Sequence, residues 1–247
     1  MVKLVYIKEI DEKIFSETVF ITGFQGFGLV GYLTTRHIVS ELGLEKIGFI
    51  KTKYMPEITF YTNRFGLIYP FELYYGEVFD KKITVLLNHS IPIKSELTKY
   101  TEFIAEWAKS RGVSMAILIG GLDPSIKESN EEEYRWIPIS NYNGNLDAPI
   151  LNERYVIGPL ALTMMFLNAR NVPGVAIFAY TEMYRPDPRA SAVAVKTVSK
   201  ILGIEIDTRK LLEEAAVIES IEEERRKFMR MVEEGVRTGR RNYTMHV

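Results

Sequence analysis

The amino-acid sequence predicts an α/β fold, a three-layer sandwich in which helices cover both faces of a mainly parallel central sheet. Two observations support this fold class. Strand-like and helix-like segments alternate along most of the chain, and the strand-like segments are continuous runs of Ile, Val and Leu. Such runs are typical of parallel strands that are buried on both faces. The 247 residues, 47% of them hydrophobic, suffice for one large domain with its own core.

The first half of the chain is predicted to supply most of the strands. Residues 18–23 form a β-branched and aromatic run that ends in glycine, which is the pattern of a buried strand. Apolar residues recur at roughly helical spacing over residues 28–42, and Gly43 can end that helix. Residues 58–79 look like antiparallel strands around a turn at residues 63–66. Two further strands are predicted at residues 46–50 and 82–90.

The second half continues the alternation. Ser95 can cap a helix over residues 96–111, and the strand predicted at residues 114–121 stops at paired glycines. Residues 122–152 are rich in Pro, Asn, Asp and Glu. Because a structureless loop of that length is unusual in a compact domain, we expect it to hold a short strand around residues 136–139. A helix (160–169), a strand (174–181) and a second helix (189–202) complete a predicted core domain, residues 1–206.

A highly charged helix is predicted to follow and to project from the core domain, from Asp207, which can cap it, to residue 234. It carries a narrow apolar stripe in a 3-4-3-4 spacing that one arginine interrupts. The stripe suits packing on a neighbouring surface or subunit, and equally on the helix's own domain. Its members are Ile218, Ile221, Phe228 and Val232. Residues 235–247 are basic and lack periodicity, so we expect a flexible tail there.

Composition narrows the classes of function. The formal net charge is −1, so no overall basic excess points to nucleic acid. The chain has no cysteine, which excludes disulfides, thiolate catalysis and zinc sites with cysteine ligands. The apolar runs fall short of the about 20 residues that cross a bilayer, and residues 1–13 carry charges throughout, unlike a targeting segment. We therefore expect a soluble, cytoplasmic protein that binds neither nucleic acid nor membrane.

One short motif resembles a nucleotide-binding loop. Gly26, Gly28 and Gly31 spell G-x-G-x-x-G between a predicted strand and a predicted helix, where a dinucleotide fold holds the pyrophosphate. The acidic residue that should follow about 20 positions later is missing, and Lys51 and Lys53 stand there instead. Two phenylalanines also crowd the loop. We interpret it as a tight strand-to-helix turn without a cofactor; a nucleotide- or nucleoside-binding enzyme that uses this turn is the alternative.

No other residue pattern in the sequence identifies a catalytic group. His89 and Ser90 are adjacent in a predicted strand, so their side chains point to opposite faces and form no base–nucleophile pair. The histidines lack the spacing of a metal site. Asp123 follows paired glycines and suits either an acid in a crevice or a turn. The three glutamates at 131–133 are typical of a solvated face. We therefore expect a protein that is not an enzyme and binds no cofactor or metal.

Three longer stretches resemble the proteasome assembly chaperone family in its archaeal form. Residues 20–43 (FITGFQGFGLVGYLTTRHIVSELG) resemble its opening strand, turn and helix, and residues 116–124 (AILIGGLDP) resemble its central strand and glycine turn. Residues 184–215 resemble its C-terminal block, in which Asp-Pro introduces a helix, a Leu-Gly-Ile-x-Ile-Asp connector follows and the last helix begins. This block is the most distinctive part of a resemblance that covers most of residues 19–216.

The resemblance implies an α/β fold related to nucleoside-phosphorylase sheets and no known catalytic constellation. It implies a chaperone or associated factor that forms a homo-oligomer and binds the proteasome core particle or its α-subunits. Related proteins often insert C-terminal tails between α-subunits through a hydrophobic-Tyr-any ending; this chain departs from that ending, with His246 in place of tyrosine. A scaffold that pairs with a paralogous subunit is a further alternative. The predicted partner-binding residues are Arg240, Arg241, Tyr243, Met245, His246 and Val247.

Overall fold

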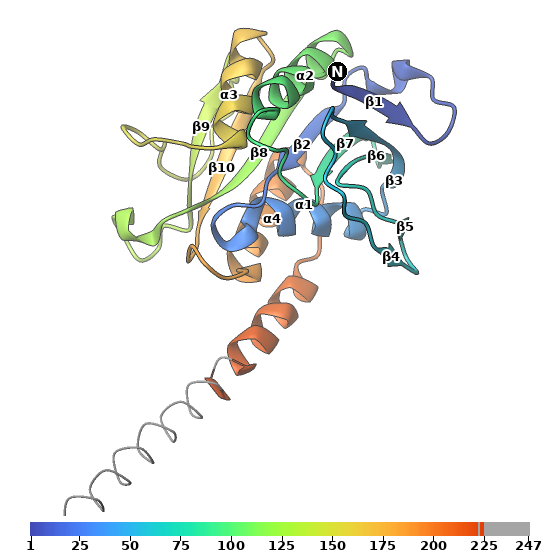
Figure 1. The fold of residues 1–247 in the computed structure, drawn as a ribbon. Helices are drawn as coiled ribbons and strands as arrows, with labels where there is room; N and C mark the ends of the chain where they lie inside the picture. The colour runs from blue at the N-terminus through green and yellow to red at the C-terminus, as the bar shows by residue number, and fades with distance from the viewer. Residues whose placement is uncertain (222, 225–247) are drawn as a thin grey trace, which may run out of the picture.

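The computed structural model describes residues 1–221 and 223–224. Within them, eight strands form one sheet in the order β1-β3-β6-β7-β2-β8-β10-β9, and β4 and β5 form a separate hairpin (Figure 1). The strands are β1 (Lys3–Tyr6), β2 (Val19–Gly23), β3 (Glu45–Lys51), β4 (Tyr61–Thr62), β5 (Gly66–Leu67), β6 (Phe71–Val78), β7 (Lys81–Asn88), β8 (Met115–Leu122), β9 (Tyr134–Ile139) and β10 (Gly174–Tyr180). The helices are α1 (Val30–Glu41), α2 (Leu97–Ser110), α3 (Pro159–Ala169) and α4 (Pro188–Leu202).

The sheet has a parallel centre and antiparallel wings. Strands β7, β2, β8 and β10 are parallel to their neighbours in that order. Strands β1, β3 and β6 on one side and β9 on the other are antiparallel. The predicted α/β fold class is confirmed. The outer wing strands are less buried than the central ones: β1 has no fully buried residue, and β3 has an exposed charged residue at each end.

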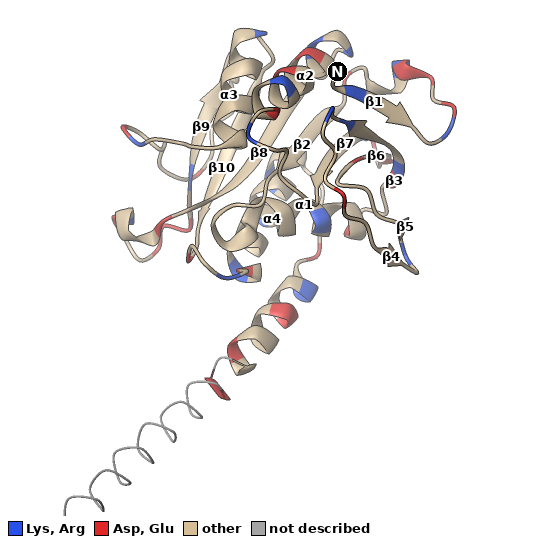
Figure 2. Cartoon of the chain, viewed as in Figure 1, with Lys and Arg blue, Asp and Glu red and all other residues tan. Residues whose placement is uncertain are grey.

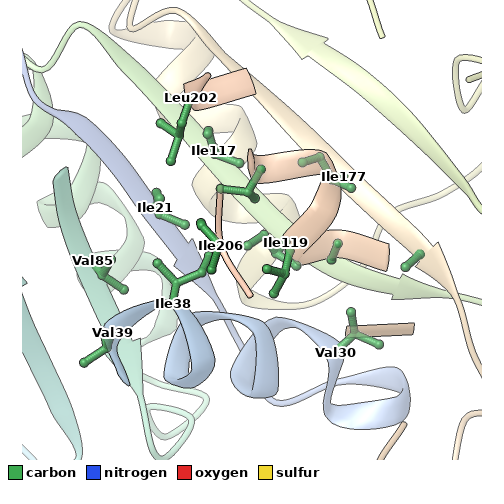
Figure 3. Packing of buried hydrophobic residues seen from close by; sticks show 14 of the residues in the cluster. Ile21, Val30, Ile38, Val39, Val85, Ile117, Ile119, Ile177, Leu202 and Ile206 are labelled. Atoms are coloured by element: carbon green, nitrogen blue, oxygen red, sulfur yellow. The ribbon is translucent and has the colours of Figure 1, made fainter. Parts of the chain in front are cut away.

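Alternate residues of the central strands pack into two separate cores. Phe20 and Leu118 lie in the core under α2 and α3, whereas Ile21 and Ile119 lie in the core under α1 and α4. Figure 3 shows the second core, where isoleucines of the sheet meet α1 side chains such as Ile38. Successive side chains of a strand point to opposite faces, so a strand buried on both faces fills both cores. This arrangement produces the three predicted layers.

Both ends of α4 follow local chemistry. Asp187 caps α4 by accepting a hydrogen bond from the backbone N–H of Ala190 at 3.0 Å, and Gly203 ends that helix in the left-handed conformation. The predicted cap of α2 was wrong. Glu96, not Ser95, holds the cap position, and its carboxylate accepts instead from the backbone N–H of Tyr54 at 2.9 Å. Glu96 thereby ties α2 to the segment that follows β3.

A helix projects from the body after α4 (Figure 1), and the structure describes residues 209–221 and 223–224 of it. Asp207 accepts a hydrogen bond from the backbone N–H of Arg209 at 2.9 Å, as expected of a residue at the helix start. Leu211 and Ala215 are buried against the core formed by α1 and α4. The predicted continuation to residue 234 and the tail lie outside the described residues. The domain boundaries at 206 and 234 stay predictions.

Candidate functional site

A cavity of about 250 Å³ opens at the carboxyl edge of the sheet, between the ends of β2, β8 and β10. The chain leaves β2 through α1 toward β3 on one side, and it leaves β8 toward β9 and β10 on the other. Ligands of open α/β sheets bind where the connections diverge in this way. The walls are mainly apolar and include the glycine turn, the paired glycines of β8 and residues 155–160.

Two of the three motif glycines are needed for close packing. A Cβ added at Gly31 would stand 2.6 Å from the backbone oxygen of Ile119, so this glycine lets α1 approach β8. Gly28 has a φ of +60°, and a Cβ there would stand 2.0 Å from Thr181 Oγ1. Both glycines are buried, while Gly26 is exposed and has open space around it. The structure supports the interpretation of a tight strand-to-helix turn.

The bulky residues of the turn have structural partners. Phe24 is buried in the core under α2 and α3, and Phe27 forms part of the cavity wall. Gln25 Nε2 donates a hydrogen bond to the backbone oxygen of His89 at 2.9 Å, which joins the turn to the end of β7. The loop is therefore pinned to its neighbours by side chains.

Sheet order argues against the dinucleotide alternative. In that fold the second strand lies beside the first and carries the ribose-binding residue at its end. Here β6 and β7 separate β3 from β2, so Lys51, at the end of β3, lies roughly 14 Å from β2 at about 4.8 Å per strand. Lys53 lies over the ring of Tyr54, 4.8 Å from its centroid. Neither lysine lines the cavity.

Two other candidate groups have structural roles. Asp123 accepts a hydrogen bond from the backbone N–H of Ser125 at 2.8 Å, and this bond lowers the pKa of Asp123; the residue serves a turn. The expected solvated face at 131–133 is wrong for one residue. Glu132 is buried and accepts hydrogen bonds from Arg135 Nε at 2.5 Å and Tyr180 Oη at 2.7 Å. The hydrogen bond from Arg135 lowers the pKa of Glu132 to about 2.

Sequence reasoning missed a buried charged group that we name the Glu72 cluster, consisting of Glu72, Lys46, Tyr74 and His89. One oxygen of the fully buried Glu72 carboxylate contacts Lys46 Nζ at 2.7 Å. The other accepts from Tyr74 Oη at 2.6 Å and lies 2.9 Å from His89 Nε2. Burial alone would raise the pKa of Glu72, but these hydrogen bonds outweigh burial and hold it below its usual value. Its members come from β3, β6 and the end of β7, so no local sequence pattern predicts the cluster.

The Glu72 cluster holds the segment between β3 and β6. Lys46 Nζ donates to the backbone oxygens of Phe65 at 2.9 Å and Leu67 at 2.7 Å, and the backbone N–H of Tyr69 donates to Glu72 at 3.0 Å. The ring of Phe60 meets His89 edge to face, with centroids 6.0 Å apart. A buried charge with several partners thus fixes the β4–β5 hairpin on the body.

The hairpin presents apolar side chains to solvent. We name this surface the hairpin patch; each member is at least half exposed, and Tyr61 reaches 70%. Exposed apolar groups that gather on one element mark interaction surfaces more often than isolated ones do. In the strand that follows the hairpin, Phe71 and Tyr74 are instead buried in the core. The members are Ile58, Phe60, Tyr61 and Leu67.

The predicted residues of the C-terminal region lie partly within the described chain. Ile218 is half-buried beside α4, and Ile221 is exposed. Phe228 and Val232 of the predicted stripe lie outside the described residues. So do all six predicted partner-binding residues: Arg240, Arg241, Tyr243, Met245, His246 and Val247. Their roles stay predictions.

Two features are absent from residues 1–221 and 223–224. No helix there combines the length and apolarity needed to span a bilayer. Over the same residues, His, Asp and Glu side chains nowhere gather in threes at a distance suited to a metal ion.

A family model matches most of this chain. The model of the PAC2 family matches residues 20–225. Over 240 residues, the chain is 22% identical to an uncharacterized protein of Methanocaldococcus jannaschii, with 94% of each chain covered. The match spans the body of the sheet and the start of the last helix.

Solved structures share the fold. The chain is similar to Pyrococcus furiosus PbaA, described as an archaeal homolog of proteasome-assembly chaperone, with a TM-score of 0.76 and 23% identity over 100% of this chain and 99% of PbaA. It is also similar to Pyrococcus furiosus PbaB, described as an archaeal proteasome activator, with a TM-score of 0.73 and 19% identity over 90% and 98% of the chains. The similarity expected from the three sequence stretches is confirmed.

Proposed function

Because the chain belongs to the PAC2 family, we propose that it is a non-enzymatic proteasome assembly chaperone or proteasome-associated factor. It binds the core particle or its α-subunits and acts as a homo-oligomer in the cytoplasm. The observation that carries the proposal is the family match over residues 20–225, together with full-length similarity in fold to PbaA. The described surface supports it, because the hairpin patch suits a protein partner.

The projecting helix suggests how the protein would reach its partner. Its base is fixed to the body by buried Leu211 and Ala215, so its direction is set by the core rather than by a free linker. In a symmetric oligomer every subunit would present one such helix. Individually weak contacts made by several helices add up to a higher avidity when the spacing fits the target. This arrangement suits a partner that is itself a ring of repeated subunits.

A pull-down tests the proposal. We expect the full-length protein to retain isolated α-subunits or the assembled core particle. A variant shortened by residues 240–247 asks whether the predicted partner-binding residues contribute, and reduced retention is expected. If the full-length protein binds neither target, the proposed function is wrong. If both proteins bind equally, the tail does not carry the contact.

The cavity keeps a second candidate function open, a nucleotide- or nucleoside-binding enzyme. Its position at the divergence of the strand connections favours this reading. Its size does not, because ligand pockets run from about 300 to 1,000 Å³ and this cavity holds about 250 Å³. Asp123, the acid nearest the cavity in sequence, is engaged in a turn. The chaperone proposal therefore fits the observations better.

A further inference from the structure

The connection from β9 to α3 carries a chemically labile pair of residues, Asn143 and Gly144. Of all the asparagines in the sequence, Asn143 alone precedes a glycine. Both residues are exposed, and residues 142–146 lie outside the helices and strands. Asparagine is one of the thermolabile residues, because the next backbone nitrogen can attack its side-chain amide. The surroundings of the Gly144 nitrogen therefore decide how easily Asn143 is converted.

The described part of the chain leaves the backbone nitrogen of Gly144 free to react. No described residue accepts a hydrogen bond from this N–H, and the side chain of Asn143 has no hydrogen-bond partner among the same residues. Gly144 also lacks a Cβ atom that would hinder the approach of the neighbouring amide. Surface connections are more mobile than the elements they join, so the nitrogen can reach Asn143 Cγ without unfolding of the domain.

Packing favours glycine at position 144. A Cβ atom added there would stand 2.3 Å from Tyr142 Oη, so the tyrosine occupies the space that a side chain would need. Tyr142 meets the ring of Trp136 edge to face, with centroids 6.2 Å apart. Trp136 belongs to the core formed by α1 and α4. The way in which this connection packs on the body therefore retains glycine, and with it the labile pair.

We propose that Asn143 is a modification site that deamidates spontaneously in the folded protein. The Gly144 nitrogen loses its proton to hydroxide and bonds to Asn143 Cγ; the bond from Cγ to Nδ2 breaks, and ammonia leaves with a proton from water. Water then opens the succinimide ring at either carbonyl and yields aspartate or isoaspartate. No group is oxidised or reduced, and water is the only co-reactant. The reaction needs no partner protein, so it goes beyond the proposed function.

The conversion changes the charge of the surface. A carboxylate replaces a neutral amide, so the formal net charge of −1 becomes more negative by one. The region is already acidic. A hollow of about 490 Å³ beside β9 is lined by Glu131, Glu133 and Asp147, whose backbone is red in Figure 2. Asp147 lies in the same connection as Asn143. Modified protein is therefore expected to elute later than unmodified protein from an anion-exchange column.

Incubation of the full-length protein in alkaline buffer tests the proposal. Trypsin then releases residues 136–154 as one peptide. Asn141 and Asn145 are exposed in the same connection but precede tyrosine and leucine, so they are matched internal controls. Mass spectrometry is expected to find conversion at Asn143 at least about tenfold faster than at either control, a barrier lower by about 1.4 kcal/mol. Equal conversion at the three asparagines would overturn the inference.

Two further measurements separate the fold from the local sequence. The full-length protein unfolded in guanidinium chloride gives the rate for an unrestrained chain. The folded protein is expected to convert Asn143 within about tenfold of that rate, and a stronger slowing would show that the fold protects this residue and would overturn the inference. Asn143→Ser is expected to remove the late-eluting species. Its accumulation at the wild-type rate in this variant would overturn the assignment to Asn143. None of these outcomes depends on proteasome binding.

Discussion

Thr181 lies directly against Gly28, so close that a Cβ atom added to the glycine would stand 2.0 Å from Thr181 Oγ1. The same threonine contacts Asp187 Oδ2 at 2.8 Å, and the backbone N–H of Asp187 donates to the oxygen of Gly28 at 2.8 Å. Asp187 in turn caps α4. The glycine turn, the end of β10 and the start of α4 therefore meet at one joint. The glycine that completes a nucleotide-like motif serves this joint.

Substituting Gly28 by alanine is expected to lower the free energy of unfolding by at least about 2 kcal/mol. Overpacking costs about 1–3 kcal/mol, and a left-handed backbone costs a side-chain-bearing residue about 1–2 kcal/mol more. Gly43→Ala is the matched control, because Gly43 has nearly the same φ, +61°, but nothing within 4 Å of the added Cβ. Chemical denaturation of both variants measures the difference. Equal losses of unfolding free energy in the two variants would mean that Thr181 moves aside without an energetic penalty. Only the backbone conformation would then require glycine at position 28.

The Glu72 cluster predicts a large penalty for neutralising its carboxylate. Glu72→Gln leaves Lys46 facing an uncharged group in a buried site, and removal of one partner from a buried pair costs about 3–5 kcal/mol. Glu77→Gln, an exposed change on the same strand, is the control and is expected to change stability by less than about 0.5 kcal/mol. Denaturant unfolding compares the two variants. A similar small effect for both would contradict a structural role of the Glu72 cluster.

Acid is expected to destabilise the protein partly through Glu132. The hydrogen bond from Arg135 lowers its folded-state pKa to about 2, from an ordinary value of 4.5. A carboxylate with a depressed pKa contributes its full stabilisation above the unfolded-state pKa and loses it as pH falls toward the folded-state value. The loss therefore falls between about pH 4.5 and pH 2. Glu132→Gln is expected to flatten this part of the stability curve, as measured by thermal unfolding at stepped pH. An unchanged slope would exclude Glu132 as a contributor.

Ligand screening decides between the two candidate functions. If the cavity bound a nucleotide, saturation at 100 times the Kd would stabilise the fold by about 2.7 kcal/mol. We expect nucleotides, nucleosides and dinucleotides to leave the melting temperature unchanged, because other parts of the chain already fill the space beside two of the motif glycines. Thr181 packs against Gly28, and the backbone of Ile119 packs against Gly31. Differential scanning fluorimetry with the full-length protein is the measurement. A shift that is lost on changing Ile157 to glutamate would place a ligand in the cavity and restore the enzyme alternative.

The sequence allowed the core strands and helices to be predicted closely, because their signals are local. The apolar run before Gly23 predicts a buried strand, and the Asp-Pro before α4 predicts the start of a helix. The predicted bounds of α4 differ from the observed Pro188–Leu202 by one residue. The Glu72 cluster could not be predicted in this way. Its residues come from separate strands, and only the sheet order brings Lys46 beside Glu72. The burial of Glu132 could not be predicted for the same reason, because its hydrogen-bond partner Tyr180 lies far along the chain.

The attachment of the last helix is expected to depend on apolar packing rather than on its surface ion pairs. Leu211 is 1% exposed in the core formed by α1 and α4, whereas its neighbour Leu212 is 37% exposed. Leu211→Ala should therefore cost about 2–5 kcal/mol of packing energy, and Leu212→Ala, which makes the same chemical change, should cost much less. Lys210 Nζ contacts Glu41 of α1 at 2.6 Å, but an exposed ion pair of this kind contributes less than about 1 kcal/mol.

Hydrogen exchange of residues 209–221 measures the attachment of the last helix in each variant. Faster exchange in Leu211→Ala alone would confirm packing as the cause, and faster exchange in Lys210→Ala would contradict it. In the first case Leu211→Ala should also weaken retention of the core particle, because the helix would lose its fixed direction.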